Sequence, residues 1–277
     1  MTLTGLLENS ITATVTVAAM IVERSRLLFT LTCSLEGFRS TADNSIKTRT
    51  GHASLFAALA GANASDSTIQ NVEITDAYAH CGLRKFKPVE DLRAAMRKGG
   101  VSRTVLCQHR GEFDHRYIET QVRANPKVFA GVFLVDMDNP RAMDDITFWA
   151  GRGYFRGLRM TAESLRNRRP LWDWAATLGL HFVVDGEVAE NVTEVSQFAA
   201  DHPSNMLVFT HMAQPRGGHE KFLALDARPN VCVQVSGMHS FGKPPYSDLR
   251  PWVEKLHGAF GAERLLYGSN FPVMGDD

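Results

Sequence analysis

The segment that decides the fold is residues 72–108, VEITDAYAHCGLRKFKPVEDLRAAMRKGGVSRTVLCQ. It contains an apolar run, Val72–Ala77, then an amphipathic stretch, Pro88–Lys98, and then a second apolar run, Arg103–Gln108. Short apolar or β-branched runs are typical of strands, and a helix is the usual connection between parallel strands. The segment therefore predicts one β-strand, α-helix, β-strand unit.

The same alternation continues along the rest of the chain. The predicted strands are Val72–Ala77, Arg103–Gln108, Val128–Val135, Phe155–Met160, His181–Asp185, Met206–Thr210, Val231–Ser236 and Arg264–Tyr267. The predicted helices are Pro88–Lys98, Asp114–Ala124, Arg141–Ala150, Leu171–Leu178, Val192–Asp201, Glu220–Asp226 and Asp248–Phe260. Nearly continuous apolar strands indicate a parallel sheet buried on both faces. Eight such units predict an α/β fold, the (β/α)₈ TIM barrel. A doubly wound open sheet is the alternative, but no Gly-x-Gly-x-x-Gly loop follows the first strand.

The two ends of the chain depart from this pattern. Residues 1–70 lack clear helix or strand periodicity, so we expect an irregular N-terminal extension before a barrel at residues 71–277. The extension is a flexible segment, a poorly specified helical appendage or translated sequence upstream of the true start. The chain stops at Asp277, just after the eighth strand, so the barrel is expected to be truncated and to lack its final helix. The extension or another chain would then cover that face, or the protein is a marginally stable truncated product.

Composition excludes several classes of protein. Hydrophobic residues at 44% and charged residues at 22% are typical of a globular protein, and 30 basic residues balance 30 acidic ones. A neutral chain has no overall field that attracts nucleic acid or an anionic membrane. The longest near-apolar run, Ile11–Val22, is too short to span a bilayer. Four cysteines without a C-x-x-C pair indicate reduced thiols, so we expect a cytoplasmic protein.

Reactive side chains in such a barrel lie at the carboxyl ends of the strands. Four of these ends resemble the amidohydrolase superfamily, most closely its amidohydrolase-related group of lactone hydrolases and decarboxylases. The matching motifs are Asp-Ala-x-Ala-His-Cys-Gly at 76–82, Phe-Arg-Gly-Leu-Arg at 155–159, Thr-His-Met-x-x-Pro at 210–215 and Tyr-Gly-Ser-x-x-Pro at 267–272. They occur in the order expected for the group.

The resemblance implies a His-x-His pair on strand one, a histidine on strand six and an aspartate on strand eight, which hold a divalent metal and activate water. His80 and His211 match two of these, so they are the expected ligands of Zn²⁺ or Mn²⁺. Tyr78 replaces the first histidine and Asn270 replaces the aspartate. A phenol stays protonated near neutral pH, and a carboxamide takes no proton from water. Both replacements are therefore expected to impair hydrolysis.

The leading hypothesis is a hydrolase that attacks a small carboxylated lactone, or a related cyclic ester or amide, with activated water. A guanidinium binds a carboxylate through two parallel hydrogen bonds, so Arg159 would orient the substrate. The residues expected to contact the substrate are Arg159, Gln108, Ser236 and Tyr78. The expected catalytic residues are His211, Asn270 and Asp185, with Asp185 as the alternative base.

Two other hypotheses stay open at this point. One is a metal-dependent decarboxylase of the same superfamily. The other is a catalytically inactive barrel, kept as a ligand-binding protein or left as a decayed product, which Tyr78 and Asn270 favour. In each case the expected partner is a small molecule, and the sequence leaves the oligomeric state open.

Overall fold

The computed structural model describes residues 73–273 in full and four short strands nearer the N-terminus. β1 (Thr12–Thr16) pairs with β4 (Thr32–Glu36), and β2 (Ile21–Glu23) pairs antiparallel with β3 (Arg26–Leu28). These strands are regular structure that the sequence analysis did not assign. The rest of the predicted extension, and its boundary at residue 71, lie outside the described residues.

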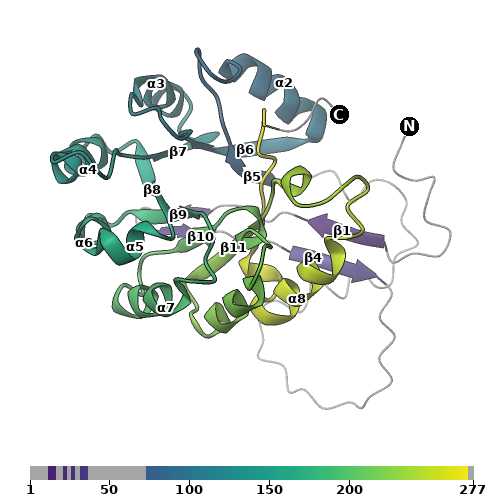
Figure 1. Cartoon of the computed structure of the whole chain (residues 1–277). Coiled ribbons are helices and arrows are strands. Elements are labelled where there is room, and N and C mark those ends of the chain that lie inside the picture. The colour runs from purple at the N-terminus through teal and green to yellow at the C-terminus, as the bar shows by residue number, and fades with distance from the viewer. Residues whose placement is uncertain (1–11, 17–20, 24–25, 29–31, 37–72, 274–277) are drawn as a thin grey trace. The chain divides into compact units, whose positions relative to one another are not determined.

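Residues 73–273 form a (β/α)₈ barrel, which confirms the predicted fold class (Figure 1). Its strands are β5 (Ile74–Ala79), β6 (Val101–Cys107), β7 (Phe129–Phe133), β8 (Phe155–Thr161), β9 (His181–Asp185), β10 (Leu207–Phe209), β11 (Val231–Val235) and β12 (Leu265–Tyr267). Neighbours in the chain are neighbours in the sheet, and every pair is parallel. Each strand overlaps a predicted run.

The helices lie around the outside of the strands (Figure 1). They are α2 (Val89–Gly99), α3 (Arg116–Ala124), α4 (Ala142–Gly151), α5 (Ser164–Asn167), α6 (Arg169–Thr177), α7 (Val192–Asp201), the 3₁₀ segment η2 (His219–Ala227) and α8 (Arg250–Phe260). Two differ from prediction, because η2 is a 3₁₀ rather than an α-helix and the four-residue α5 was not predicted. Within the described residues, no helix is long and apolar enough to cross a membrane.

Local sequence explains why α2 begins and ends where it does. Pro88 precedes the helix, and Glu90 and Asp91 lie in its first turn, where the helix dipole favours negative charge. Gly100 ends the helix with φ of 68°, a left-handed conformation that glycine adopts without strain. The chain then enters β6 at once.

The barrel closes where β5 meets β12. The Asn270 N–H donates to the Tyr78 carbonyl at 2.8 Å, and the His80 N–H donates to the Phe271 carbonyl at 2.7 Å. Gly268 allows this approach, because a Cβ there would lie 2.8 Å from the Tyr78 Cβ. Closure therefore joins the chain segments that carry Tyr78, His80 and Asn270.

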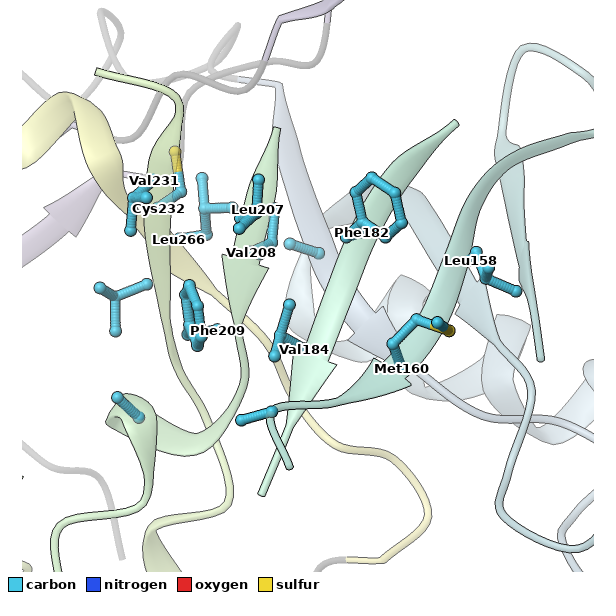
Figure 2. Packing of buried hydrophobic residues seen from close by; sticks show 14 of the residues in the cluster. Leu158, Met160, Phe182, Val184, Leu207, Val208, Phe209, Val231, Cys232 and Leu266 are labelled. Carbon is cyan, nitrogen blue, oxygen red and sulfur yellow. The ribbon is translucent and has the colours of Figure 1, made fainter. Parts of the chain in front are cut away.

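The main hydrophobic core includes side chains on neighbouring strands of the barrel (Figure 2) and side chains of the helices outside them. Side chains alternate along β9, so Phe182 and Val184 belong to this outer core while Val183 packs inside the barrel. Phe182 stacks on Trp172 of α6 with 4.9 Å between the ring centroids. A small separate cluster fills the barrel interior, and Tyr78 is its largest member.

Candidate active site

Tyr78 lies at the centre of the residues gathered at the carboxyl ends of the strands. Its side chain is fully buried, and the rings of His80 and His211 pack edge-on against it at centroid distances of 4.8 Å and 5.4 Å. The Tyr78 hydroxyl has no hydrogen-bond partner among the described residues. Burial raises the pKa of the phenol above its usual value, so the hydroxyl stays a neutral donor.

His80 is held in one tautomer. Its Nδ1 lies 2.6 Å from the carbonyl oxygen of Cys107, so Nδ1–H donates and Nε2 keeps its lone pair. Burial, with the positive charge of Arg159 as a further cause, lowers the pKa of His80 to about 3. The imidazole is therefore neutral near neutral pH.

His211 opens an unusual turn after β10. His211, Met212, Ala213 and Gln214 have φ values of 55°, 56°, 56° and 53°, so the chain makes a left-handed turn without glycine. Each such residue costs about 1–2 kcal/mol relative to right-handed backbone. The Trp252 indole N–H offsets part of this cost by donating to the Met212 carbonyl at 2.9 Å. Strain of this kind is typical of functional sites.

The turn brings the His211 ring onto the end of β11. Ser236 Oγ accepts the His211 backbone N–H at 3.1 Å and lies 3.0 Å from Nδ1 of the ring. Gly237, with φ of 60°, leaves room for the ring, because a Cβ there would lie 2.4 Å from Nδ1. Burial lowers the pKa of His211, so its imidazole is also neutral near neutral pH.

Asp185, at the end of β9, pairs with two arginines. Its Oδ2 lies 2.7 Å from Arg159 Nη2 and 3.2 Å from Arg110 Nη2. Its Oδ1 accepts three further hydrogen bonds, from Gln214 Nε2 at 2.7 Å, the Gly186 N–H at 2.9 Å and Thr210 Oγ1 at 3.3 Å. Burial would raise the pKa of Asp185, but the two guanidiniums outweigh burial and lower it to about 2.

Arg159 is largely buried and only partly satisfied. Its Nη1 donates to the Gln108 carbonyl at 3.0 Å, and its Cζ lies 5.7 Å from the centre of the Tyr78 ring. Its Nε is buried and has no partner among the described residues. Two arginines share one carboxylate, so Arg159, Arg110 and Asp185 carry a net charge of +1.

The side chain of Gln108 is committed to its own loop. Its Nε2 donates to the Asp114 carbonyl at 3.0 Å, and its Oε1 accepts the His109 N–H at 3.0 Å. The carbonyl of Gln108 faces Arg159, whereas its side-chain amide is already used. The predicted substrate contact through this side chain therefore stays a proposal.

Asp76 fixes the position of the loop that carries Asn270. The Asp76 carboxylate accepts the Tyr78 N–H at 3.0 Å, the Ser269 N–H at 2.9 Å and the Ser269 hydroxyl at 2.5 Å. Asn270 follows Ser269 directly and is buried with φ of 57°. Asp76 therefore fixes the loop that carries Asn270.

The described residues do not fit a catalytic metal centre. No group of three or more His, Cys, Asp or Glu side chains in residues 73–273 could hold a metal ion. His80 and His211 are separated by the neutral Tyr78 phenol, and the fourth expected position holds the amide of Asn270. A catalytic zinc site has three strong protein ligands, and this set offers two imidazoles.

The structure gathers Tyr78, His80, His211, Arg159 and Asp185 around one barrel mouth, with Ser236 against His211 and Asn270 beside Tyr78. Three residues in the same network were not singled out from the sequence, namely Asp76, Arg110 and Gln214. Asp76 opens the strand-one motif, which was the available signal. Arg110 and Gln214 lie in loops after β6 and β10, where no pattern marks them.

Comparison with known proteins gives one curated relative of substantial length. L-fucono-1,5-lactonase of Burkholderia ambifaria is 29% identical over 211 residues, which cover 69% of this chain and 71% of the lactonase. A probable 2-pyrone-4,6-dicarboxylic acid hydrolase of Acinetobacter baumannii, solved with citric acid, is 13% identical with a TM-score of 0.60 and covers 73% of this chain and 85% of its own.

A zinc-bound amidohydrolase of Burkholderia multivorans is 20% identical, with a TM-score of 0.55, over 72% of this chain and 84% of its own. At these identities the two solved structures support the fold alone. The amidohydrolase family matches residues 49–277, so the match includes part of the segment that precedes the barrel. The chain belongs to the amidohydrolase family.

Proposed function

We propose that this protein hydrolyses a small carboxylated lactone, or a related cyclic ester, with water as the nucleophile. The observation that carries the proposal is the net positive charge of Arg159, Arg110 and Asp185, together with the buried Nε of Arg159, which has no partner among residues 73–273. A buried donor without an acceptor is costly, so this site favours an anionic ligand oxygen. Similarity to a lactonase supports an ester as the reacting group.

The proposed proton acceptor is His211. When Nδ1–H donates to Ser236 Oγ, Nε2 of the neutral ring holds the lone pair and takes a proton from water. The resulting oxygen nucleophile bonds to the lactone carbonyl, the ring C–O bond breaks, and the imidazolium returns the proton to the leaving oxygen. Asp185 is a poor base, because its pKa is about 2 and both its oxygens are already paired.

Tyr78 is proposed to stabilise the charge that develops on the carbonyl oxygen. Its buried hydroxyl has no partner within the described part of the chain and stays protonated, so it is a preorganised hydrogen-bond donor. Such donors contribute about 10²–10³-fold in rate in other enzymes. Because the donor set does not fit a metal, no step is assigned to one, and a bound divalent metal is not part of this proposal.

A second candidate is a ligand-binding barrel without turnover. Asn270 has no basic form, and the Asp185 carboxylate is already paired with five hydrogen-bonding groups. Neither residue is therefore available as a base. The anionic site around Arg159 would then bind a carboxylate without catalysis.

Turnover of matched lactones tests the proposal. The protein is expected to hydrolyse a lactone with a free carboxylate faster than its methyl ester, and His211→Gln should abolish this activity. His257→Gln on α8 is the matched control. Hydrolysis that survives His211→Gln would overturn the base assignment, and binding of the carboxylate without turnover by the wild type would favour the ligand-binding barrel.

A further inference from the structure

The two carboxylate oxygens of Asp185 face different parts of the site. Oδ2 faces the arginines, at 2.7 Å from Arg159 Nη2 and 3.2 Å from Arg110 Nη2. Oδ1 accepts a hydrogen bond of 2.7 Å from Gln214 Nε2. Gln214 is the last residue of the left-handed turn that follows β10. One carboxylate therefore joins the arginines to this turn.

The turn has a backbone conformation that depends on contacts from outside. Residues 211–214 have φ values between 53° and 56°, and none of them is glycine. This left-handed region is unfavourable for residues that carry a Cβ atom. Strained backbone persists only where the surrounding structure holds it in place. Loss of one such contact should therefore let the turn relax.

Hydrogen bonds from other elements hold the turn at its start, its middle and its end. At the start, Ser236 Oγ accepts the His211 N–H at 3.1 Å. In the middle, Trp252 Nε1 donates to the Met212 carbonyl at 2.9 Å. At the end, the half-buried Gln214 side chain reaches back to the last residue of β9, 29 positions earlier in the chain. The last of these contacts depends on a single amide group.

Movement of Gln214 is transmitted to the residue that carries the imidazole. The Gln214 N–H donates to the His211 carbonyl at 2.9 Å, so the two ends of the turn are bonded to each other. The His211 ring lies 5.4 Å from the Tyr78 ring between centroids, and its Nδ1 lies 3.0 Å from Ser236 Oγ. A relaxed turn would change both distances.

We propose that Asp185 and Gln214 are positioning residues, which hold the His211 imidazole at a fixed distance from the arginines that bind the substrate carboxylate. Asp185 holds the arginines through Oδ2 and the turn through Oδ1, and it takes no proton in this role. The catalytic part of this inference rests on the proposed function. The part that concerns the turn does not.

Gln214→Leu tests the role of the amide, because leucine keeps a side chain of similar size without the donor. Thr210→Val is the matched control. It removes a hydroxyl 3.3 Å from the same oxygen of Asp185, at an extended residue that precedes the turn. Both variants therefore take one donor from Asp185, but only Gln214→Leu releases the end of the turn.

Steady-state kinetics with γ-carboxy-γ-butyrolactone should separate the two variants. Gln214→Leu is expected to lower kcat about 10–10²-fold, because a catalytic group displaced by about 1 Å loses rate on this scale. KM should change less than about twofold, since the arginines keep their contacts with Oδ2. Thr210→Val should change both constants less than about twofold. Equal losses of kcat in the two variants, or a raised KM with unchanged kcat in Gln214→Leu, would overturn the inference.

Hydrogen exchange measured by NMR tests the turn without catalysis. The amides of Ala213 and Gln214, which donate to the Thr210 and His211 carbonyls, should exchange about fivefold faster in Gln214→Leu than in the wild type and Thr210→Val. The amide of Phe182 on β9 should exchange at the same rate in all three proteins. Gln214→Ala, which adds no apolar surface, should give the same result if Gln214→Leu is unstable. Unchanged exchange in the turn would overturn the inference.

The two measurements distinguish failure of this inference from failure of the proposed function. Faster exchange confined to the turn of Gln214→Leu, without hydrolysis of any lactone by the wild type, supports the positioning role and rejects the hydrolase. Hydrolysis that His211→Gln abolishes, with unchanged exchange and unchanged kcat in Gln214→Leu, supports the hydrolase and rejects the positioning role.

Discussion

The carboxylate of Asp76 holds Ser269, which lies 193 positions further along the chain, through both the backbone N–H and the hydroxyl of the serine. The pair lies where β5 meets β12, and Asp76 is almost completely buried. Burial raises the pKa of Asp76 to about 6, against the opposing effect of the Ser269 hydrogen bonds. The contact that closes the barrel is therefore sensitive to pH.

Asp76 is expected to destabilise the fold as pH rises. Its pKa in the folded protein lies above the unfolded value, so its stabilising contribution is complete below about pH 4 and is lost as pH rises through 6. Between pH 5 and 7.5 the free energy of unfolding should fall by about 1 kcal/mol relative to Asp76→Asn. Urea unfolding of both proteins at several pH values measures the difference. A constant gap across this range would contradict the shifted pKa.

Asp185→Asn is expected to destabilise the protein, because it leaves the Arg159 charge buried without its partner. The expected loss is about 3–5 kcal/mol in the free energy of unfolding. The double variant Asp185→Asn with Arg159→Met should be more stable than the sum of the two single changes predicts. Denaturant unfolding of the four proteins gives the coupling energy, and additive losses would show that the pair does not interact.

Gly237→Ala is expected to displace the His211 ring and lower activity. The new Cβ would lie 2.4 Å from Nδ1, and a displacement of about 1 Å in a catalytic group costs about 10²-fold in rate. Gly100→Ala is a matched control, since its φ of 68° is close to the 60° of Gly237 and no atom lies within 4 Å. Both variants share the backbone strain. Equal activity in the two variants would mean that the contact with His211 is unimportant.

Tyr78→His should create the missing ligand for a metal. A second histidine two positions before His80 restores the His-x-His pair, and bound zinc should increase about 10-fold or more. Metal content after equilibration with zinc and gel filtration measures the effect, with Tyr78→Phe as the control. Full and equal occupancy in the wild type and Tyr78→His would show that the phenol does not limit binding.

Asn270→Asp should raise the rate of lactone hydrolysis by supplying a carboxylate base, by up to about 10²–10⁴-fold. Aspartate tolerates the left-handed φ of 57° at this position, so the backbone should not change. Initial rates for the wild type, Asn270→Asp and Asn270→Ala test the expectation. If Asn270→Asp binds a lactone yet hydrolyses it no faster than the wild type, the assignment of a base to this position is wrong.

The barrel is predictable from the sequence because each strand and helix has its own local pattern. β9 has the same bounds in the prediction and in the structure, His181–Asp185, since its apolar run ends at polar residues on both sides. The four-residue α5 is too short for any periodicity. η2 keeps the apolar spacing of a helix, and that spacing does not distinguish a 3₁₀ from an α-helix.

The site is predictable as a set of strand ends but not as a set of contacts. Asp185 was identified as a nearby carboxylate, yet the two guanidiniums that lower its pKa come from β8 and from the loop after β6. The left-handed turn at 211–214 contains no glycine, so nothing in the sequence marks it. Both features depend on tertiary contacts, which local patterns do not record.

The junction between β5 and β12 also constrains the order of events during synthesis. The nascent chain releases Asp76 and Tyr78 from the ribosome long before Ser269 and Asn270 exist to meet them. Contacts between such distant segments form late, because closing a long loop costs entropy before any contact is gained. A small molecule that binds residues from both strands therefore finds no binding site in the early folding intermediates. It can act as a pharmacological chaperone only by stabilising the final docking of β12.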